Sequence, residues 1–209
     1  MSHLPIEFFA RREAEMLALL GELVNCESPS TEKPAVDALG RRLAEILGGL
    51  PGTVETFPQT QSGNHLLYRW GGDDRPLLIL CHMDTVFDLG TTAQRPFRVE
   101  GERAYGPGVL DMKAGIAMAV TALRALHETP GGPGLPVQLL INSDEEIGST
   151  SSRALIEKLA AQARAVLVLE PATPSGAIKT SRKGVGDLRI ETQGTAAHAG
   201  AAHAEGRNA

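Results

Sequence analysis

Hydrophobic residues recur along the chain in spacings that alternate between those of helices and those of strands. Apolar side chains three or four residues apart predict amphipathic helices, whereas short continuous apolar runs predict strands covered on both faces. The predicted helices cover residues 5–24, 36–50, 112–126 and 149–159, and the predicted strands cover residues 53–57, 65–70, 77–81, 137–141 and 166–169. The strands at 77–81 and 166–169 are continuous apolar runs, and all of the last three strands are expected to be buried. This order predicts an α/β fold with a mostly parallel (mixed) sheet flanked by helices.

The pattern changes after Pro171. Residues 177–180 predict a short strand, and the alternation of apolar and polar residues over 188–192 predicts a half-exposed strand. We therefore expect one domain over residues 1–182 and the beginning of a second over residues 183–209. The second segment is too short to close a core of its own, and its unpaired strand predicts poor protection from amide exchange.

Composition narrows the classes of function. The formal net charge is −5 and no Lys/Arg cluster is present, which argues against a nucleic-acid partner. No run approaches the roughly 20 apolar residues of a membrane span, and no signal peptide is evident, so a cytoplasmic location is expected. Two cysteines give no disulfide framework. The serine-hydrolase elbow Gly-x-Ser-x-Gly and the phosphate-binding glycine motifs are also absent from the sequence.

Acidic and histidine residues gather where the predicted buried strands end. Four segments share this position: His82-Met83-Asp84, Asp111-Met112-Lys113, Asp144-Glu145-Glu146 and Glu170. Because active sites in open α/β sheets collect at the carboxyl ends of strands, these side chains are expected to converge. Imidazole and carboxylate ligands indicate a metal site, and more carboxylates than one ion needs suggest two ions.

Each strand-end segment also has a simpler interpretation when it is taken alone. His82 and Asp84 are two residues apart and project from one side of the sheet, but a surface turn would give the same tripeptide. Asp111 alone favours a helix cap, although its apolar neighbours suggest an inward-pointing ligand that bridges two ions. Glu170 alone is typical of a loop. The joint pattern is more specific than any of its parts.

Two further groups carry alternatives. Three adjacent acids at Asp144-Glu145-Glu146 usually form a solvated charge run, but their position at the end of a buried strand argues against it. One glutamate could bind a metal while the other takes a proton from water. His198, with His203 close by, is either an exposed loop histidine or a donor to a developing oxyanion or a substrate carboxylate.

With these segments in view, the chain resembles the co-catalytic zinc peptidase family that includes glutamate carboxypeptidase, aminoacylase-1, acetylornithine deacetylase and succinyl-diaminopimelate desuccinylase. The segments that carry the resemblance are residues 80–86, 104–115, 142–149, 169–171 and 194–200, in the order found in the family. Residues 95–101 and 198–202 look most like the glutamate carboxypeptidase branch. The resemblance implies a zinc-peptidase catalytic domain followed by an α+β lid, or dimerisation, domain.

The resemblance also implies a set of metal ligands. His82 would bind one zinc ion, and Asp111 would bridge two. Glu146 and Glu170 would complete the ligation, one on each ion. Zinc suits this set of ligands, and cobalt or manganese could also occupy it.

The implied catalytic residues are Glu145, Asp84 and His198. Glu145 would be the general base, and Asp84 would orient His82. His198, on the lid domain, would reach the active site of a partner subunit in a homodimer and polarise the scissile carbonyl. The implied reaction is hydrolysis of an amide or peptide bond next to a C-terminal amino acid, by water that two zinc ions activate.

Two alternatives remain open at this point. The deacetylase and desuccinylase branches of the family predict an N-acyl amino acid deacylase instead of a carboxypeptidase. In the family the chain continues beyond the lid and supplies a last histidine ligand and contacts to the substrate carboxylate. The 209 residues are therefore expected to be C-terminally truncated and impaired alone, and a non-catalytic metal-binding fragment is the remaining alternative.

Overall fold

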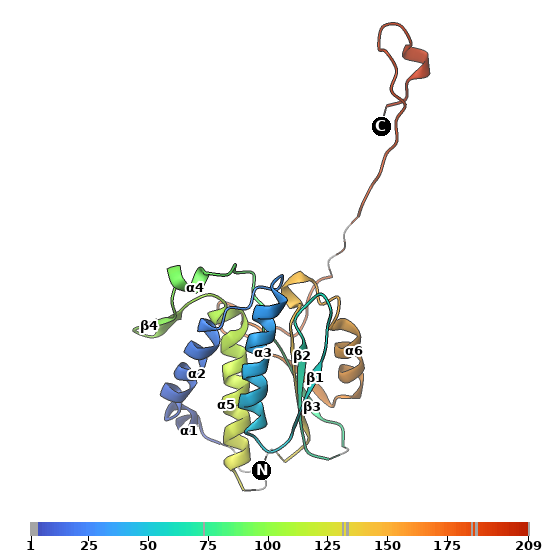
Figure 1. Ribbon diagram of the computed structural model, residues 1–209. Coiled ribbons are helices and arrows are strands. Elements are labelled where there is room, and N and C mark those ends of the chain that lie inside the picture. Colours follow the sequence, from blue (N-terminus) through green and yellow to red (C-terminus); the bar gives the residue numbers. More distant parts are fainter. Residues whose placement is uncertain are drawn as a thin grey trace. The chain divides into compact units, whose positions relative to one another are not determined.

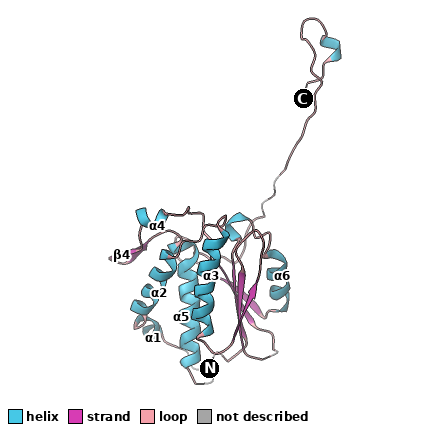
Figure 2. Ribbon diagram, in the orientation of Figure 1, coloured by secondary structure: helices cyan, strands magenta, loops and turns pink. Residues whose placement is uncertain are grey.

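The structure, a computed structural model, describes residues 4–72, 74–130, 132, 134–184, 186 and 188–208 (Figures 1 and 2). Contacts divide the chain into two compact units, one that ends at Pro171 and one that begins at Ala172. The assignment of residues 183–209 to the start of a lid domain stays a prediction.

The first unit is built on a five-stranded sheet with the order β1-β2-β6-β3-β7. Its strands are β1 (Thr53–Phe57), β2 (His65–Trp70), β3 (Leu77–His82), β6 (Val137–Asn142) and β7 (Ala165–Val168). β3 is parallel to both β6 and β7, whereas β2 is antiparallel to both β1 and β6. The sheet is therefore mixed, as the sequence predicts. The carboxyl ends of the three parallel strands meet at one edge, which is where an active site is expected.

Helices cover both faces of this sheet (Figure 1). α2 (Glu13–Asn25), α3 (Lys33–Gly48) and α5 (Ala114–Glu128) lie on one face, and α6 (Arg153–Gln162) lies on the other. Within β6, Leu139 belongs to the first layer's core, whereas Leu140 packs with Leu159 of α6. Successive strand residues project to opposite faces, so a strand between two helical layers needs a continuous apolar run. None of the described helices is both long and apolar enough to span a membrane.

All four predicted helices differ from the observed ones in extent. α3 begins at Lys33 instead of residue 36 and ends at Gly48 instead of residue 50. The first is broken at Arg11 and Arg12 into α1 (Ile6–Ala10) and α2; α1 contains no buried residue, so no packing extends one helix through both. α5 begins two residues later than predicted because Asp111 and Met112 have non-helical backbone angles. α6 begins at Arg153 instead of Ser149, whose positive φ of 54° does not fit a helix.

The region predicted to be rich in loops contains short elements that the sequence prediction missed. They are α4 (Thr91–Gln94), β4 (Arg98–Glu100) and β5 (Arg103–Tyr105). β4 and β5 form a separate antiparallel pair. Gly101 lies in the turn between them with a φ of 58°, a conformation that glycine adopts without a steric penalty.

The third predicted buried strand is exposed. Val166, Leu167 and Val168 of β7 expose 38%, 47% and 57% of their surfaces. β7 lies at the edge of the sheet and pairs with β3, so among the described residues it has a neighbour on one side. The apolar run correctly predicted a strand, but the prediction of burial was wrong for the residues that the structure describes.

In the second unit the two predicted strands are not formed. Residues 177–180 and 188–192 have no regular secondary structure, and Leu188 and Ile190 expose 86% and 75% of their surfaces. A strand is stabilised by pairing and burial, and neither segment has a partner strand among the described residues. The described structure here is a short 3₁₀ turn at His203–Glu205 and an isolated bridge between Thr195 and Arg207.

Candidate metal centre

His82, the last residue of β3, is the centre of the site. It is 1% exposed. Its Nδ1 lies 3.0 Å from the backbone oxygen of Asp84 and 3.4 Å from Asp84 Oδ1. A carbonyl oxygen only accepts, so Nδ1 donates its proton and the neutral ring leaves Nε2 free as a ligand. When the ring is neutral, the side chain is thus in the tautomer that binds a metal through Nε2.

Two carboxylates approach that nitrogen. Asp111 Oδ1 lies 3.1 Å from His82 Nε2, and Glu170 Oε1 lies 3.3 Å from it. Asp111 lies in the kinked turn before α5, and no side chain caps that helix through a hydrogen bond. The alternative that Asp111 serves as a helix cap therefore finds no support in the described hydrogen bonds.

Two groups of potential ligands share His82. Ligand atoms of His82, Glu145 and Glu170 lie within 4.8 Å of one another, and so do ligand atoms of His82, Asp111 and Glu146. The structure therefore brings together all four residues predicted as ligands, and Glu145 with them. Imidazole nitrogen and carboxylate oxygen fit zinc, cobalt or manganese, so the residues present fit a divalent metal. The identity and number of ions, and the role of each residue, stay predictions.

Asp84 connects His82 to the glutamates. Its carboxylate is fully buried, and it accepts the backbone N–H of Glu145 at 3.2 Å and that of Glu146 at 3.2 Å. It also accepts the hydroxyl proton of Ser30 at 2.7 Å. A buried carboxylate needs such donors because its desolvation is costly. Asp84 therefore joins the turn after β3 to the turn after β6 and fixes the backbone of both glutamates.

Charges in the site shift the pKa values of its groups. Burial lowers the pKa of His82, but hydrogen bonds and charges from Asp84 and Glu170 outweigh burial and raise that pKa to about 11. Desolvation, together with the charges of neighbouring carboxylates, raises the pKa of Glu145 and of Glu146. The carboxylates outnumber the single imidazole, so a divalent cation would relieve their mutual repulsion.

Asp144 has a different environment from the two glutamates that follow it. It is fully buried, and its Oδ2 accepts the backbone N–H groups of Ser151 at 2.7 Å and Ser152 at 3.2 Å. The Ser151 hydroxyl lies 2.7 Å from the same oxygen. For Asp144 the alternative of a solvated charge run is therefore wrong. Its side chain holds the loop that carries Glu145 and Glu146.

His198 lies in the second unit, where its side chain is exposed. Its Nδ1 accepts the backbone N–H of Gly200 at 3.2 Å and that of Ala201 at 3.1 Å. These two bonds orient the ring locally. The predicted role of His198 at an active site stays a prediction.

Sequence reasoning missed several residues that support the site. Ser30 donates its hydroxyl proton to Asp84. Lys113 is 1% exposed and donates to the backbone oxygen of Cys26 at 2.8 Å; burial lowers its pKa to about 8. His65 and Ser151, described further below, contact the loop around Asp144. Their hydrogen-bond partners lie far away in the sequence, so no local spacing of residues predicts these contacts.

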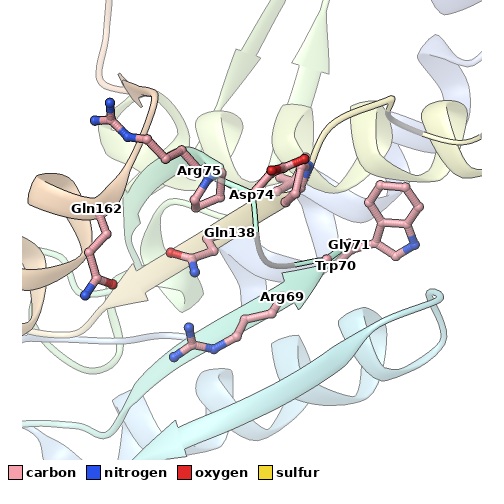
Figure 3. Close-up of a pocket in the computed structure, with 11 residues that line it drawn as sticks. Arg69, Trp70, Gly71, Asp74, Arg75, Gln138 and Gln162 are labelled. Carbon is pink, nitrogen blue, oxygen red and sulfur yellow. The ribbon is translucent and has the colours of Figure 1, made fainter.

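A pocket of about 590 Å³ lies at the opposite end of the strands (Figure 3). It is lined by Arg69 and Trp70 at the end of β2 and by Val137 and Gln138 at the start of β6. Gln138 Oε1 is buried and has no hydrogen-bond partner among the described residues. None of the predicted metal ligands lines this pocket.

Comparison with known proteins identifies the protein family. Residues 78–204 match the family model described as peptidase family M20/M25/M40, and the chain therefore belongs to that family. It is 37% identical over 199 residues to carboxypeptidase G2 of Pseudomonas sp. (strain RS-16), covering 93% of this chain and 48% of the relative. It is 31% identical over 202 residues to a succinyl-diaminopimelate desuccinylase of Rhodospirillum centenum (strain ATCC 51521 / SW), covering 90% and 52%. The chain spans about half the length of the curated relatives it matches.

Solved structures share the fold. An M20 family metallo-carboxypeptidase from Sulfolobus solfataricus gives a TM-score of 0.66 at 23% identity over 78% of this chain and 39% of its own. Human carnosine dipeptidase 1 gives a TM-score of 0.68 at 19% identity over the same shares of the two chains. The predicted resemblance to the zinc peptidase family and the predicted mixed α/β sheet are confirmed.

Proposed function

We propose that this chain carries the metal-binding part of a hydrolase that cleaves an amide or peptide bond next to a C-terminal amino acid, as in a glutamate carboxypeptidase. One observation carries the proposal: the ligand atoms of His82, Asp111, Glu146, Glu145 and Glu170 converge in two overlapping groups, each within 4.8 Å. The 37% identity to carboxypeptidase G2 supports this reaction class.

Two zinc ions are the proposed cofactor, and cobalt or manganese are the alternatives. His82, Asp111, Glu146 and Glu170 would hold the ions. A bound divalent metal would polarise the substrate carbonyl and make water acidic enough to lose a proton near neutral pH.

The remaining chemistry belongs to this chain's own side chains. Glu145 would take the proton from the attacking water and pass it to the departing amine. Its raised pKa favours holding that proton between the two steps. Asp84 would keep His82 and the backbone of Glu145 in place through the contacts described above. In a homodimer, His198 would donate to the developing oxyanion in the partner's site.

A deacylase that releases a small acyl group from an N-acyl amino acid is the second candidate. The 31% identity to succinyl-diaminopimelate desuccinylases supports it. The two candidates share the metal centre and the general base and differ in the groups that recognise the substrate.

The test is hydrolysis assayed on the protein as its native host makes it, supplied with zinc. Folyl-glutamate and N-acetyl-glutamate represent the first candidate, and N-succinyl and N-acetyl diamino acids represent the second. Glu145→Gln should abolish turnover, while Glu157→Gln, an exposed glutamate on α6 paired with Arg153, should leave it unchanged. A zinc-loaded protein that hydrolyses none of these substrates, or a Glu145→Gln variant with full activity, would contradict the proposal.

A further inference from the structure

A buried histidine outside the ligand set contacts both ends of the loop that carries the glutamates. His65 begins β2 and is 1% exposed. Its Nδ1 lies 3.0 Å from Ser143 Oγ, and its Nε2 lies 3.2 Å from Ser151 Oγ. These serines flank residues 144–150, which we call the acidic segment. One ring, on a strand paired on both sides, therefore spans the two ends of the acidic segment.

Counting protons shows which partner donates in each contact. The only proton of the Ser143 hydroxyl goes to the carbonyl oxygen of Gly63, so Ser143 Oγ can only accept from His65 Nδ1. Nδ1 therefore carries a proton. The backbone carbonyl leaves no alternative because it has no proton to give.

The second contact involves Asp144. The Ser151 hydroxyl lies 2.7 Å from Asp144 Oδ2, and one proton must lie between these oxygens. Two backbone N–H groups, from Ser151 and Ser152, donate to the same carboxylate oxygen and favour its ionised form. The hydroxyl of Ser151 then donates to Asp144, and His65 Nε2 donates to Ser151 Oγ when the ring carries its second proton. The hydroxyl of Ser62, 2.8 Å away, can donate to the remaining lone pair of Ser151 Oγ.

We propose that His65 is a positioning residue of the metal centre, which donates through Nδ1 to Ser143 and, when its ring is protonated, through Nε2 to Ser151, and so fixes the acidic segment that presents Glu145 and Glu146. The proposal rests on the proposed function, because positioning has meaning only if those glutamates serve a metal centre. His65 touches neither the substrate nor a ligand atom; it acts through the two serines.

The charges around His65 set the balance between its two protonation states. Burial is the largest influence and leaves the pKa of His65 below its usual value; the charges of Asp144 and Asp84 oppose this shift, and that of Lys33 adds to it. These charged groups lie in the turns after β6 and β3 and at the start of α3. The ring therefore gains its second proton only as the pH falls below neutral. With the ring neutral, Nε2 has no proton to donate, and the tie to Ser151 is lost while the tie to Ser143 remains.

The first readout needs neither metal nor activity. Nitrogen-15 shifts of the His65 ring, measured by NMR on the metal-free protein as the pH is lowered from neutral, should show a proton on Nδ1 throughout and a second proton on Nε2 as the ring becomes charged. His127, whose Nε2 lies 2.7 Å from the Tyr68 hydroxyl, is an internal reference, and burial lowers its pKa. A neutral ring whose proton lies on Nε2 instead of Nδ1 would overturn this arrangement.

The second readout is zinc affinity, measured by competition with a chelating dye. Groups that orient metal ligands typically change metal affinity by about 10- to 100-fold, so His65→Phe should weaken zinc binding by that range while His127→Phe leaves it unchanged. If His65→Phe fails to fold, Ser151→Ala removes only the hydroxyl and should weaken binding about tenfold. Partial rescue by His65→Gln, which keeps one donating end, would support positioning over mere filling of space.

The outcomes separate this inference from the proposed function. A wild-type protein that binds zinc as tightly as its folded His65→Phe and Ser151→Ala variants would overturn the positioning role and leave the proposed function standing. A wild-type protein that binds no zinc would overturn both, whatever the NMR experiment shows about the ring.

Discussion

The two ends of the central sheet carry polar side chains that are held in very different ways. At the carboxyl end, Asp84 accepts hydrogen bonds from Glu145, Glu146 and Ser30, and every one of them joins segments distant in sequence. At the amino end, Gln138 leaves a buried oxygen without a partner among the described residues, beside an open pocket of about 590 Å³ (Figure 3).

The comparison shows how a site can be distinguished from a polar surface. Removing a carboxylate from water costs several kcal/mol unless donors replace the water. At the carboxyl end those donors are backbone N–H groups and hydroxyls, and they also fix the position of the groups they satisfy. This end is therefore organised around negative charge before any cation arrives, which is a property that a metal centre requires.

The largest effect is expected from removing the proposed general base, Glu145. Glu145→Gln should lower kcat/KM of the native enzyme by about a hundredfold to ten-thousandfold, the usual contribution of a general base, and leave zinc affinity within a few-fold of the wild type. Gln138→Ala at the amino end should leave kcat/KM unchanged. Steady-state kinetics on the two variants checks this. Equal losses of kcat/KM in the two variants would contradict the proposed difference between the two ends of the sheet.

The next largest effect concerns Asp84. In Asp84→Asn an amide NH₂ replaces one oxygen and faces a backbone N–H or the Ser30 hydroxyl, so at least one buried donor loses its partner. Zinc affinity should fall by about 10- to 100-fold. The matched control is Asp88→Asn, at an exposed position on the loop after β3, which should bind zinc as the wild type does. Zinc titration of both variants gives the answer, and unchanged affinity in Asp84→Asn would mean that this carboxylate does not organise the site.

The pH dependence of zinc binding tests the role of His82 at the carboxyl end of the sheet. Without metal, the pKa of His82 is raised from 6.5 to about 11, so the imidazolium stabilises the fold fully below about pH 6.5 and less as the pH rises toward 11. Zinc requires the neutral ring and must displace this proton. Affinity should therefore rise by up to about tenfold per pH unit above neutral pH. Competition with a chelating dye at several pH values measures this affinity. A zinc affinity that does not change with pH would show that His82 releases no proton when zinc binds.

The smallest effect is expected at the amino end. Gln138→Met removes a buried oxygen that has no described partner, so the free energy of unfolding should stay the same or rise by up to about 1 kcal/mol. Asn142→Met changes the other end of the same strand, where the side-chain NH₂ donates to Ser152 at 3.1 Å, and it should destabilise the fold by about 1–3 kcal/mol. Urea unfolding of both variants measures the difference. A loss of stability in Gln138→Met as large as that in Asn142→Met would contradict the comparison.

The sequence predicted the parts of the molecule that depend on local pattern. The largely apolar segment at 137–141 forms β6, which helices cover on both faces (Figure 1). The alternating pattern at 188–192 forms no strand because no described segment pairs with it. The sequence pattern indicates which side chains a strand would bury. The strand forms only where the rest of the fold provides a neighbouring strand to pair with it.

The residues of the candidate site also fall into those that the sequence predicts and those that it does not. His82 and Glu170 could be grouped from sequence because β3 and β7 run parallel and end at one edge of the sheet. Asp111 follows no strand of this sheet and lies in the kinked turn before α5. Ser30 and His65 could not be found, since they lie 54 and 86 residues from the partners Asp84 and Ser151, and neither belongs to a spacing motif. The ligands at the strand ends follow from topology, whereas the residues that hold them follow from tertiary packing.

Zinc binding to the wild type and to Asp111→Asn tests the central claim most directly. Asp111 is 55% exposed at its side chain, so the substitution should leave the fold intact while removing a charged ligand from one of the two groups around His82. We predict that the wild type binds zinc and that the variant binds it at least about tenfold more weakly. A wild type without zinc affinity, or a variant that binds as tightly and with the same stoichiometry, would contradict the assignment of a metal centre to the carboxyl end of the sheet.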